Sequence, residues 1–194
     1  MRAETDDYCD QTRRRVIAAA LAAPAALLAG RATAAIAQGQ ASGPLPERTL
    51  ILSNTHTGES MSAQYCTKGQ YCPEVLSQLN HLLRDHRSGE SAVIDPALFD
   101  VLHSLALRAD RAPHFEVISG FRSAASNASL RALSSGVARN SLHMQGKAMD
   151  VRLVGANCAR LRDLATALEA GGVGYYRQSD FVHLDTGRVR VWQG

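Results

Sequence analysis

The stretch Ser141-Leu-His-Met-Gln-Gly-Lys-Ala-Met-Asp-Val-Arg-Leu153 decides how the centre of this chain folds. From residue 147 onward its polar and apolar side chains alternate, which indicates a strand with two different faces. The apolar face needs helices packed over it, whereas the other face carries a carboxylate that we expect to point into a cleft or into solvent. The apolar face holds Met149, Val151 and Leu153, and the other holds Ala148, Asp150 and Arg152.

Helices and strands of ordinary length surround this strand along the chain. Pro73, the pair Asp95-Pro96 and Asn157 mark helix starts, because proline fits the first helical turn and Asp or Asn caps it. We expect helices over 73–86, 96–106, 125–135 and 158–170, and strands over 49–53, 60–65, 115–119, 173–176, 181–185 and 189–192. Helices come early, strands cluster late and no regular β–α–β alternation is present. This order predicts the α+β class, with a small, mainly antiparallel sheet and helices packed on one face.

Three side chains that favour metal binding are predicted to meet on one face of the sheet. In 181–185 the alternation puts Phe181, His183 and Asp185 together, and His143 lies in the loop that leads into the strand of Asp150. Two imidazoles and one carboxylate, with a fourth position left to water, are what a catalytic zinc ion needs. Spacing alone leaves the alternative open, because the chain has seven histidines and a single His or Asp on a strand is usually a surface or capping residue.

The first 37 residues have the pattern of an export signal. Arg13 and Arg14 precede an alanine-rich apolar run over 16–30, and 35–37 (Ala-Ile-Ala) form the small-x-small pattern of a cleavage site. The arginine pair resembles a twin-arginine signal, although four acidic residues dilute the start of the chain. The run is short of the roughly 20 residues that a membrane span needs. We therefore expect a cleaved signal over 1–37, with retention as an anchor as the alternative, a flexible lead-in over 38–48, one domain over 49–194 and no stable membrane span after cleavage.

Composition excludes other classes of function. The chain has 21 basic and 18 acidic residues and a net charge of +3, which is too low and too scattered for nucleic-acid binding. The run Gly171-Gly-Val-Gly174 follows a helix instead of opening one, so we interpret it as a helix end and a tight turn and not as a phosphate-binding loop. Of the three cysteines after residue 37, Cys66 and Cys72 enclose a short polar loop and are the first candidates for a disulfide, which leaves Cys158 over.

Several separated motifs resemble one family of zinc peptidases. The pattern Ser141-x-His143-x-x-Gly146-x-Ala148-x-Asp150 resembles the SxHxxGxAxD signature of the D-Ala-D-Ala metallopeptidases and hedgehog-like zinc peptidases. The segment 119–123 (SGFRS) resembles their SGYRS segment. Segments 56–59, 82–85, 171–176 and 179–188 look like the YcbK-like branch of this family, which contains periplasmic murein endopeptidases. The resemblance covers about 49–192 and implies a hedgehog or D-Ala-D-Ala peptidase-like fold.

The resemblance also implies roles for individual residues. His143, Asp150 and His183 would bind one Zn²⁺ ion, and Arg122 would hold a substrate carboxylate or carbonyl and stabilise the oxyanion. The family commonly has a glutamate as general base three residues before the last histidine. Here that position is Asp180, one methylene shorter, which must lie in the turn before the strand and curl back over the metal. Asp185 is the alternative, either as the base or as an acceptor that orients His183.

By resemblance the protein is an exported, periplasmic zinc metallopeptidase that uses metal-activated water to hydrolyse peptide cross-links of peptidoglycan. Two alternatives remain open. One is a D,D-carboxypeptidase or dipeptidase that acts on stem peptides. The other is a non-catalytic zinc-containing domain that binds the cell wall. Neither the residues nor the resemblance distinguishes D,D-cross-links from L,D-cross-links.

Overall fold

The structure, a computed structural model, describes residues 47–134 and 136–194. The described residues belong to one compact unit. The predicted export signal over 1–37 and residues 38–46 of the lead-in lie outside the described residues, so these assignments stay predictions. In the part of the chain that the structure describes, none of the helices has the length and apolar character needed to cross a bilayer.

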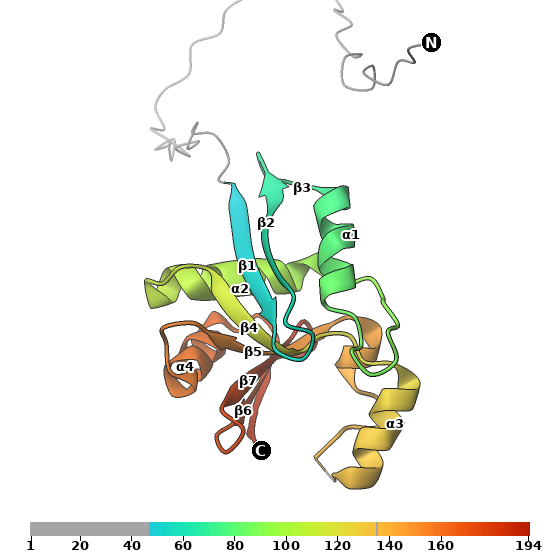
Figure 1. Cartoon of the computed structure of the whole chain (residues 1–194). Helices are drawn as coiled ribbons and strands as arrows, with labels where there is room; N and C mark the ends of the chain where they lie inside the picture. Colours follow the sequence, from blue (N-terminus) through green and yellow to red (C-terminus); the bar gives the residue numbers. More distant parts are fainter. Residues whose placement is uncertain (1–46, 135) are drawn as a thin grey trace, which may run out of the picture. The chain divides into compact units, whose positions relative to one another are not determined.

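One sheet of eight strands organises the described residues (Figure 1). Its strands are β1 (Arg48–Asn54), β2 (Ser60–Thr67), β3 (Gln70–Tyr71), β4 (His114–Ser119), β5 (Ala148–Leu153), β6 (Gly172–Tyr176), β7 (Phe181–Asp185) and β8 (Arg190–Gln193). Their order across the sheet is β3-β2-β1-β4-β5-β7-β6-β8. The predicted α+β class with a mainly antiparallel sheet is confirmed.

Two features of the sheet differ from the prediction. The sheet is larger than expected, because the two-residue strand β3 extends one edge and every predicted strand joins the same sheet. Two neighbouring pairs, β1–β4 and β6–β8, are parallel. A parallel neighbour needs a connection that returns to the starting end of the sheet. The chain provides it through α1 and α2 between β1 and β4, and through β7 between β6 and β8.

Three of the helices begin where Pro73, Asp95-Pro96 and Asn157 predicted. They are α1 (Pro73–Leu82), α2 (Pro96–Ala109), α3 (Ala124–Leu133), a 3-10 helix η1 (Leu142–Gln145) and α4 (Cys158–Leu168). The side chain of Asp95 accepts from the Ala97 amide at the start of α2, and Asn157 accepts from the Arg160 amide at the start of α4. Helix α4 ends earlier than predicted, because Glu169 takes a left-handed conformation with φ of 53°.

The hydrophobic core lies on one face of the sheet. Met149, Val151 and Leu153 of β5 are buried in it, as their alternation predicted. Helices α2 and α4 pack against each other and against strands of this sheet, and α1 packs on β2; α2 crosses β1 in the view of Figure 1. Burying this apolar face leaves the opposite face of β5 and its neighbours free to carry polar side chains.

The three described cysteines are free thiols, which corrects the expected disulfide. Across β2 and β3, Cys66 pairs with Tyr71 and not with Cys72. The Cys66 thiol is buried and accepts a hydrogen bond from Nη2 of Arg48 at 2.9 Å. Cys72 lies 3.6 Å from the Thr67 hydroxyl, and Cys158 is buried at the start of α4.

Candidate metal centre

Cross-strand register places the polar side chains of the site in two adjacent rows. In the first row Ser119 of β4 pairs with Asp150 of β5, and Asp150 pairs with His183 of β7. The row continues through Gly174 of β6 to Trp192 of β8. Residues that pair directly across a sheet project from the same face. Four strands from distant parts of the sequence therefore deliver their side chains to one line above the sheet.

The second row lies next to the first and holds the residues that contact His183 and Trp192. Here Gly172 of β6 pairs with Arg190 of β8, and its amide donates to Oδ1 of Asp185 of β7 at 3.0 Å. A Cβ atom on Gly172 would lie 2.4 Å from both the Asp185 carboxylate and the Arg190 guanidinium, and one on Gly174 would lie 2.5 Å from the Trp192 ring. Residues 172–174 thus belong to β6, in line with the predicted strand over 173–176, and the interpretation of these glycines as a helix end and tight turn was wrong. Its glycines let longer side chains cross β6 toward β7.

His143 enters the site from the 3-10 helix η1, directly before β5. Its Nδ1 donates to the backbone carbonyl of Gly120 at 2.7 Å, because a carbonyl can only accept. The proton is thereby fixed on Nδ1, and the lone pair of Nε2 points into the site. The amide of Arg122 donates back to the His143 carbonyl at 3.2 Å, so η1 and the 119–123 segment hold each other.

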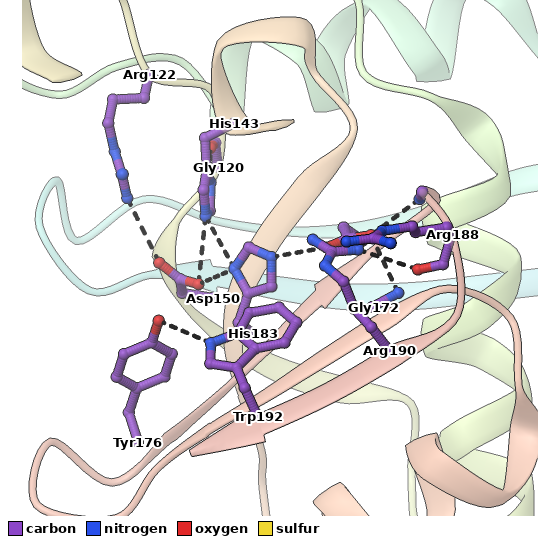
Figure 2. Close-up of polar contacts among 12 residues, drawn as sticks. Gly120, Arg122, His143, Asp150, Gly172, Tyr176, His183, Arg188, Arg190 and Trp192 are labelled. Atoms are coloured by element: carbon purple, nitrogen blue, oxygen red, sulfur yellow. Dashed lines mark hydrogen bonds and ion pairs between the residues drawn. The ribbon is translucent and has the colours of Figure 1, made fainter. Parts of the chain in front are cut away.

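His143, Asp150 and His183 converge on one point (Figure 2). One ligand atom from each of these buried residues lies within 4.8 Å of the other two. Oδ1 of Asp150 lies 2.8 Å from Nδ1 of His183 and 3.3 Å from Nε2 of His143, and the two nitrogens are 3.2 Å apart. The outer nitrogen of His183, Nε2, donates to Oδ2 of Asp185 at 3.1 Å, which leaves the Nδ1 lone pair to the cluster.

The electrostatics of this cluster call for a positive charge at its centre. Burial lowers the pKa of His183, but hydrogen bonds and charges of Asp150 and Asp185 outweigh burial and raise it to about 9. Burial also lowers the pKa of His143. For Asp150, burial raises the pKa, but the two histidines outweigh burial and hold it well below its usual range. Without an ion one shared proton supplies the charge. A divalent cation fits the same two lone pairs and carboxylate.

A cavity of about 360 Å³ opens beside the cluster, and all three of its residues line it. Arg122 lies on the wall of this cavity. Its Nη2 donates to the Ser119 hydroxyl at 3.2 Å and lies 3.6 Å from Oδ2 of Asp150. Its Nε is buried and has no hydrogen-bond acceptor among the described residues. The guanidinium of Arg122 therefore lies next to the cluster, as the resemblance implied.

The two candidate bases lie in very different places. Asp180 is in the turn before β7, but its side chain is 69% exposed, lies 3.7 Å from Nε of Arg152 and is absent from the described lining of the cavity. Asp185 is fully buried and binds Arg190, with contacts of 2.7 Å and 3.1 Å. The geometry does not support Asp180 as the general base, and the identity of the base stays a prediction. The contacts of Asp185 are those of an acceptor that orients His183.

Sequence reasoning missed three residues of this site, namely Tyr176, Arg190 and Trp192, which all line the cavity. Arg190 holds Asp185, and its guanidinium lies 4.8 Å from the centroid of the Trp192 ring. The Trp192 ring is 5.2 Å from that of His183. The signal that points to these residues is the pair of glycines at 172 and 174, since small residues in a strand often mark a close approach of another group.

Comparison with known proteins identifies the family. Residues 43–192 match the peptidase family described as Peptidoglycan L,D-endopeptidase MepK. The chain is 44% identical to the Peptidoglycan L,D-endopeptidase MepK of Escherichia coli (strain K12) over 188 residues, which are 96% of this chain and 100% of the relative. It is 37% identical to the Probable peptidoglycan L,D-endopeptidase MepK of Haemophilus influenzae over 190 residues, which are 97% of this chain and 99% of the relative. The chain therefore belongs to the MepK family of peptidoglycan endopeptidases.

Proposed function

We propose that this protein is an exported zinc metallopeptidase that hydrolyses L,D-cross-links of peptidoglycan. The observation that carries the proposal is the convergence of three ligand atoms, two of which belong to histidines whose other ring nitrogen already donates to a fixed acceptor. His143, Asp150 and His183 would hold one zinc ion, the usual ion for such a donor set in an exported hydrolase. When bound, the ion would polarise a carbonyl and lower the pKa of a water molecule. The same motifs support the assignment to the hedgehog and D-Ala-D-Ala peptidase-like fold.

The surrounding residues keep the ligands in a fixed tautomer and orientation. Gly120 fixes the proton of His143, and Asp185 fixes that of His183. Asp185 accepts hydrogen bonds from Arg190, from the amides of Gly172 and Gly187 and from His183, so it has no lone pair left for a reacting proton. We assign to Asp185 the role of an orienting acceptor rather than that of the base.

Arg122 is the group best placed to orient the substrate. It stays charged at every working pH and presents donors on a rigid plane, which suits a carboxylate or a developing oxyanion. Its position beside Asp150, with Nε unbonded, supports this role. The stem peptides of peptidoglycan carry free carboxylates, and the names of the relatives favour the L,D-cross-link over a D,D-bond or a stem end as the point of cleavage.

One observation favours a second candidate function. Among the described residues that line the cavity, Asp150 is the only one with a carboxylate, and it belongs to the cluster itself. A site without a separate carboxylate base fits a zinc-containing domain that binds the wall without cutting it. The family relationship to named endopeptidases makes the enzyme the first choice.

A digestion experiment separates these candidates. Purified protein is incubated with sacculi and with isolated L,D-cross-linked and D,D-cross-linked muropeptide dimers, with zinc or with a chelator. We expect zinc-dependent conversion of the L,D-dimer to monomers. Cleavage of the D,D-dimer or release of terminal residues would favour the carboxypeptidase or dipeptidase alternative. Binding to sacculi without any product would overturn the enzyme and favour the wall-binding domain.

We propose that residues 1–37 direct the domain over 49–194 to the periplasm by the twin-arginine route. The arginine pair and the alanine-rich run support this assignment. Changing Arg13 and Arg14 to Lys should leave the precursor in the cytoplasm, as measured by fractionation and immunoblotting. Unchanged export would instead indicate the general secretory route.

A further inference from the structure

The hydroxyl of Tyr176 is a hydrogen-bond donor without an acceptor at the edge of the site. Tyr176 lines the same cavity as the cluster, and its ring stacks on Phe181 with centroids 4.6 Å apart and an angle of 16°. Its oxygen accepts a hydrogen bond from Nε1 of Trp192 at 3.2 Å, as Figure 2 shows. An indole nitrogen can only donate, so this bond occupies a lone pair and leaves the phenolic hydrogen free. Within residues 47–134 and 136–194 no acceptor binds that hydrogen.

The Tyr176 hydroxyl is also held in place from two sides. Stacking on Phe181 fixes the plane of the ring, and the bond from Trp192 fixes the oxygen. Trp192 can reach this position only because Gly174 has no side chain beneath the indole ring. The fold therefore keeps a free donor in a defined place on the wall of the cavity, where a ligand that enters the cavity can accept its hydrogen bond.

Tyr176 and Arg122 together place donors around the cluster. Both residues line the cavity, where Arg122 contacts Asp150 and Tyr176 lies at the end of β6, its ring stacked on Phe181 of β7. Hydrolysis of an amide puts negative charge on the carbonyl oxygen, and fixed donors directed at that oxygen stabilise the transition state. A cavity with fixed donors is suited to this task.

Resting on the proposed peptidase function, we propose that Tyr176 is a catalytic residue that donates a hydrogen bond to the carbonyl oxygen of the scissile amide. The bond forms as negative charge develops on that oxygen, and no covalent bond to tyrosine is made. Trp192 is a positioning residue that holds the hydroxyl through its Nε1. Tyr175, the preceding residue, is outside this arrangement, because its ring contacts the guanidinium of Arg162, 4.9 Å from the ring centroid.

The test compares Tyr176→Phe, Trp192→Phe and the matched control Tyr175→Phe on the isolated L,D-cross-linked dimer. Tyr176→Phe keeps the stacked ring, so the unfolding midpoint and the bound zinc should equal those of the wild type. We expect its kcat to fall roughly 10²- to 10³-fold with little change in KM, as for the loss of one oxyanion donor. Trp192→Phe leaves the hydroxyl present but free to move, so its kcat should fall less. Tyr175→Phe should behave as the wild type.

A Tyr176→Phe variant with the kcat of an active wild type would overturn the role of Tyr176 and leave the peptidase function intact. Equal losses in Tyr176→Phe and Trp192→Phe would also overturn it, because the hydroxyl would then serve only to anchor the indole ring. A zinc-loaded wild type without activity on any cross-link would overturn both proposals. A second measurement uses a phosphinate in place of the scissile amide. Tyr176→Phe should weaken binding of this analogue more than binding of the cleaved product, and equal weakening would contradict the proposal.

Discussion

Two polar clusters lie in opposite halves of the same sheet, and they differ in whether their members satisfy each other. In the β3-β2-β1 half, Asp100 of α2 pairs with Arg48 at 2.5 Å and accepts hydrogen bonds from the hydroxyls of Tyr65 and Tyr71 at 2.9 and 2.6 Å. Both tyrosine hydroxyls and the Arg48 guanidinium thus have an acceptor within the cluster. In the other half, Asp150 faces the lone pairs of His143 and His183, so three acceptors meet with no donor of their own.

The difference separates a structural cluster from a binding site. The Asp100 cluster is neutral and complete, and it holds α2 against three strands without any ligand. The Asp150 cluster is complete only with a cation or a shared proton between its acceptors. Burial of such a cluster lowers the stability of the metal-free fold, so the metal ion should stabilise the folded protein. Substitutions in the two clusters should therefore have different consequences.

The largest effect is expected from His143→Ala. Removing one of three ligands leaves two, so bound zinc and cleavage of the L,D-dimer should both fall to background. Zinc content by mass spectrometry and product release by chromatography measure the two effects. The matched control is His81→Ala, which changes an exposed histidine on α1. Undiminished activity in His143→Ala would contradict the metal mechanism.

A smaller loss is expected from Asp185→Asn. The amide cannot hold His183 and Arg190 in the same way, and loss of such a partner usually costs roughly 10- to 100-fold in metal affinity. Competition with a fluorescent chelator measures the affinity. Asp100→Asn is the matched control, because it makes the same change in a carboxylate that also binds an arginine. If both variants bound zinc as the wild type does, Asp185 would not orient the site.

Asp85 combines a property of each cluster. Its buried carboxylate accepts from the amides of Arg87 and Ser123, next to Arg122, so it is satisfied like Asp100 but holds a segment of the site. Burial raises its pKa, but hydrogen bonds from Ser126, Ser123 and Arg87 outweigh burial and lower it. Asp85→Asn should destabilise the fold by about 2 kcal/mol and reduce activity.

The pH dependence gives the check on Asp85. Because the pKa of Asp85 is lowered on folding, its ionised form stabilises the protein above the ordinary pKa of about 4. This stability is lost as the pH falls through the lowered value. In urea unfolding, the gap between wild type and Asp85→Asn should be largest near neutral pH and shrink below about pH 4. A constant gap across this range would mean that the charge of Asp85 is not what stabilises the segment.

The smallest effect is expected from Tyr65→Phe in the Asp100 cluster. One hydrogen bond is lost, at a cost of about 1 kcal/mol, while activity per folded molecule stays unchanged. Burial and the bond to Asp100 raise the pKa of Tyr65, so its stabilising effect is complete below the ordinary pKa of about 10. Above that pH it is lost, because the unfolded tyrosine ionises and the folded one does not. At pH 8 the free energy of unfolding should therefore be larger for the wild type than for Tyr65→Phe, and this difference should shrink at higher pH. Loss of activity at neutral pH would contradict the separation of the two clusters.

The sequence by itself determined the elements and the identity of the metal-binding candidates. Alternation in 148–153 and 181–185 depends only on local geometry, and so do the helix starts at Pro96 and Cys158, which follow capping residues. His143 and Asp150 are also close in sequence, since one lies just before β5 and the other lies in it. These features could be predicted because each rests on residues that are neighbours in the chain.

Only the tertiary structure decided which side chains support the site. The roles of Asp180 and Asp185, the meaning of the glycines in β6 and the presence of Tyr176 and Trp192 at the cavity depend on the register between β5, β7, β6 and β8. The parallel pairs β1–β4 and β6–β8 depend on contacts between distant segments in the same way. Register fixes which residues share a row, and no single strand carries that information. This is the physical reason why local motifs and the family resemblance could name the candidate ligands, whereas their surroundings could not be predicted from the sequence.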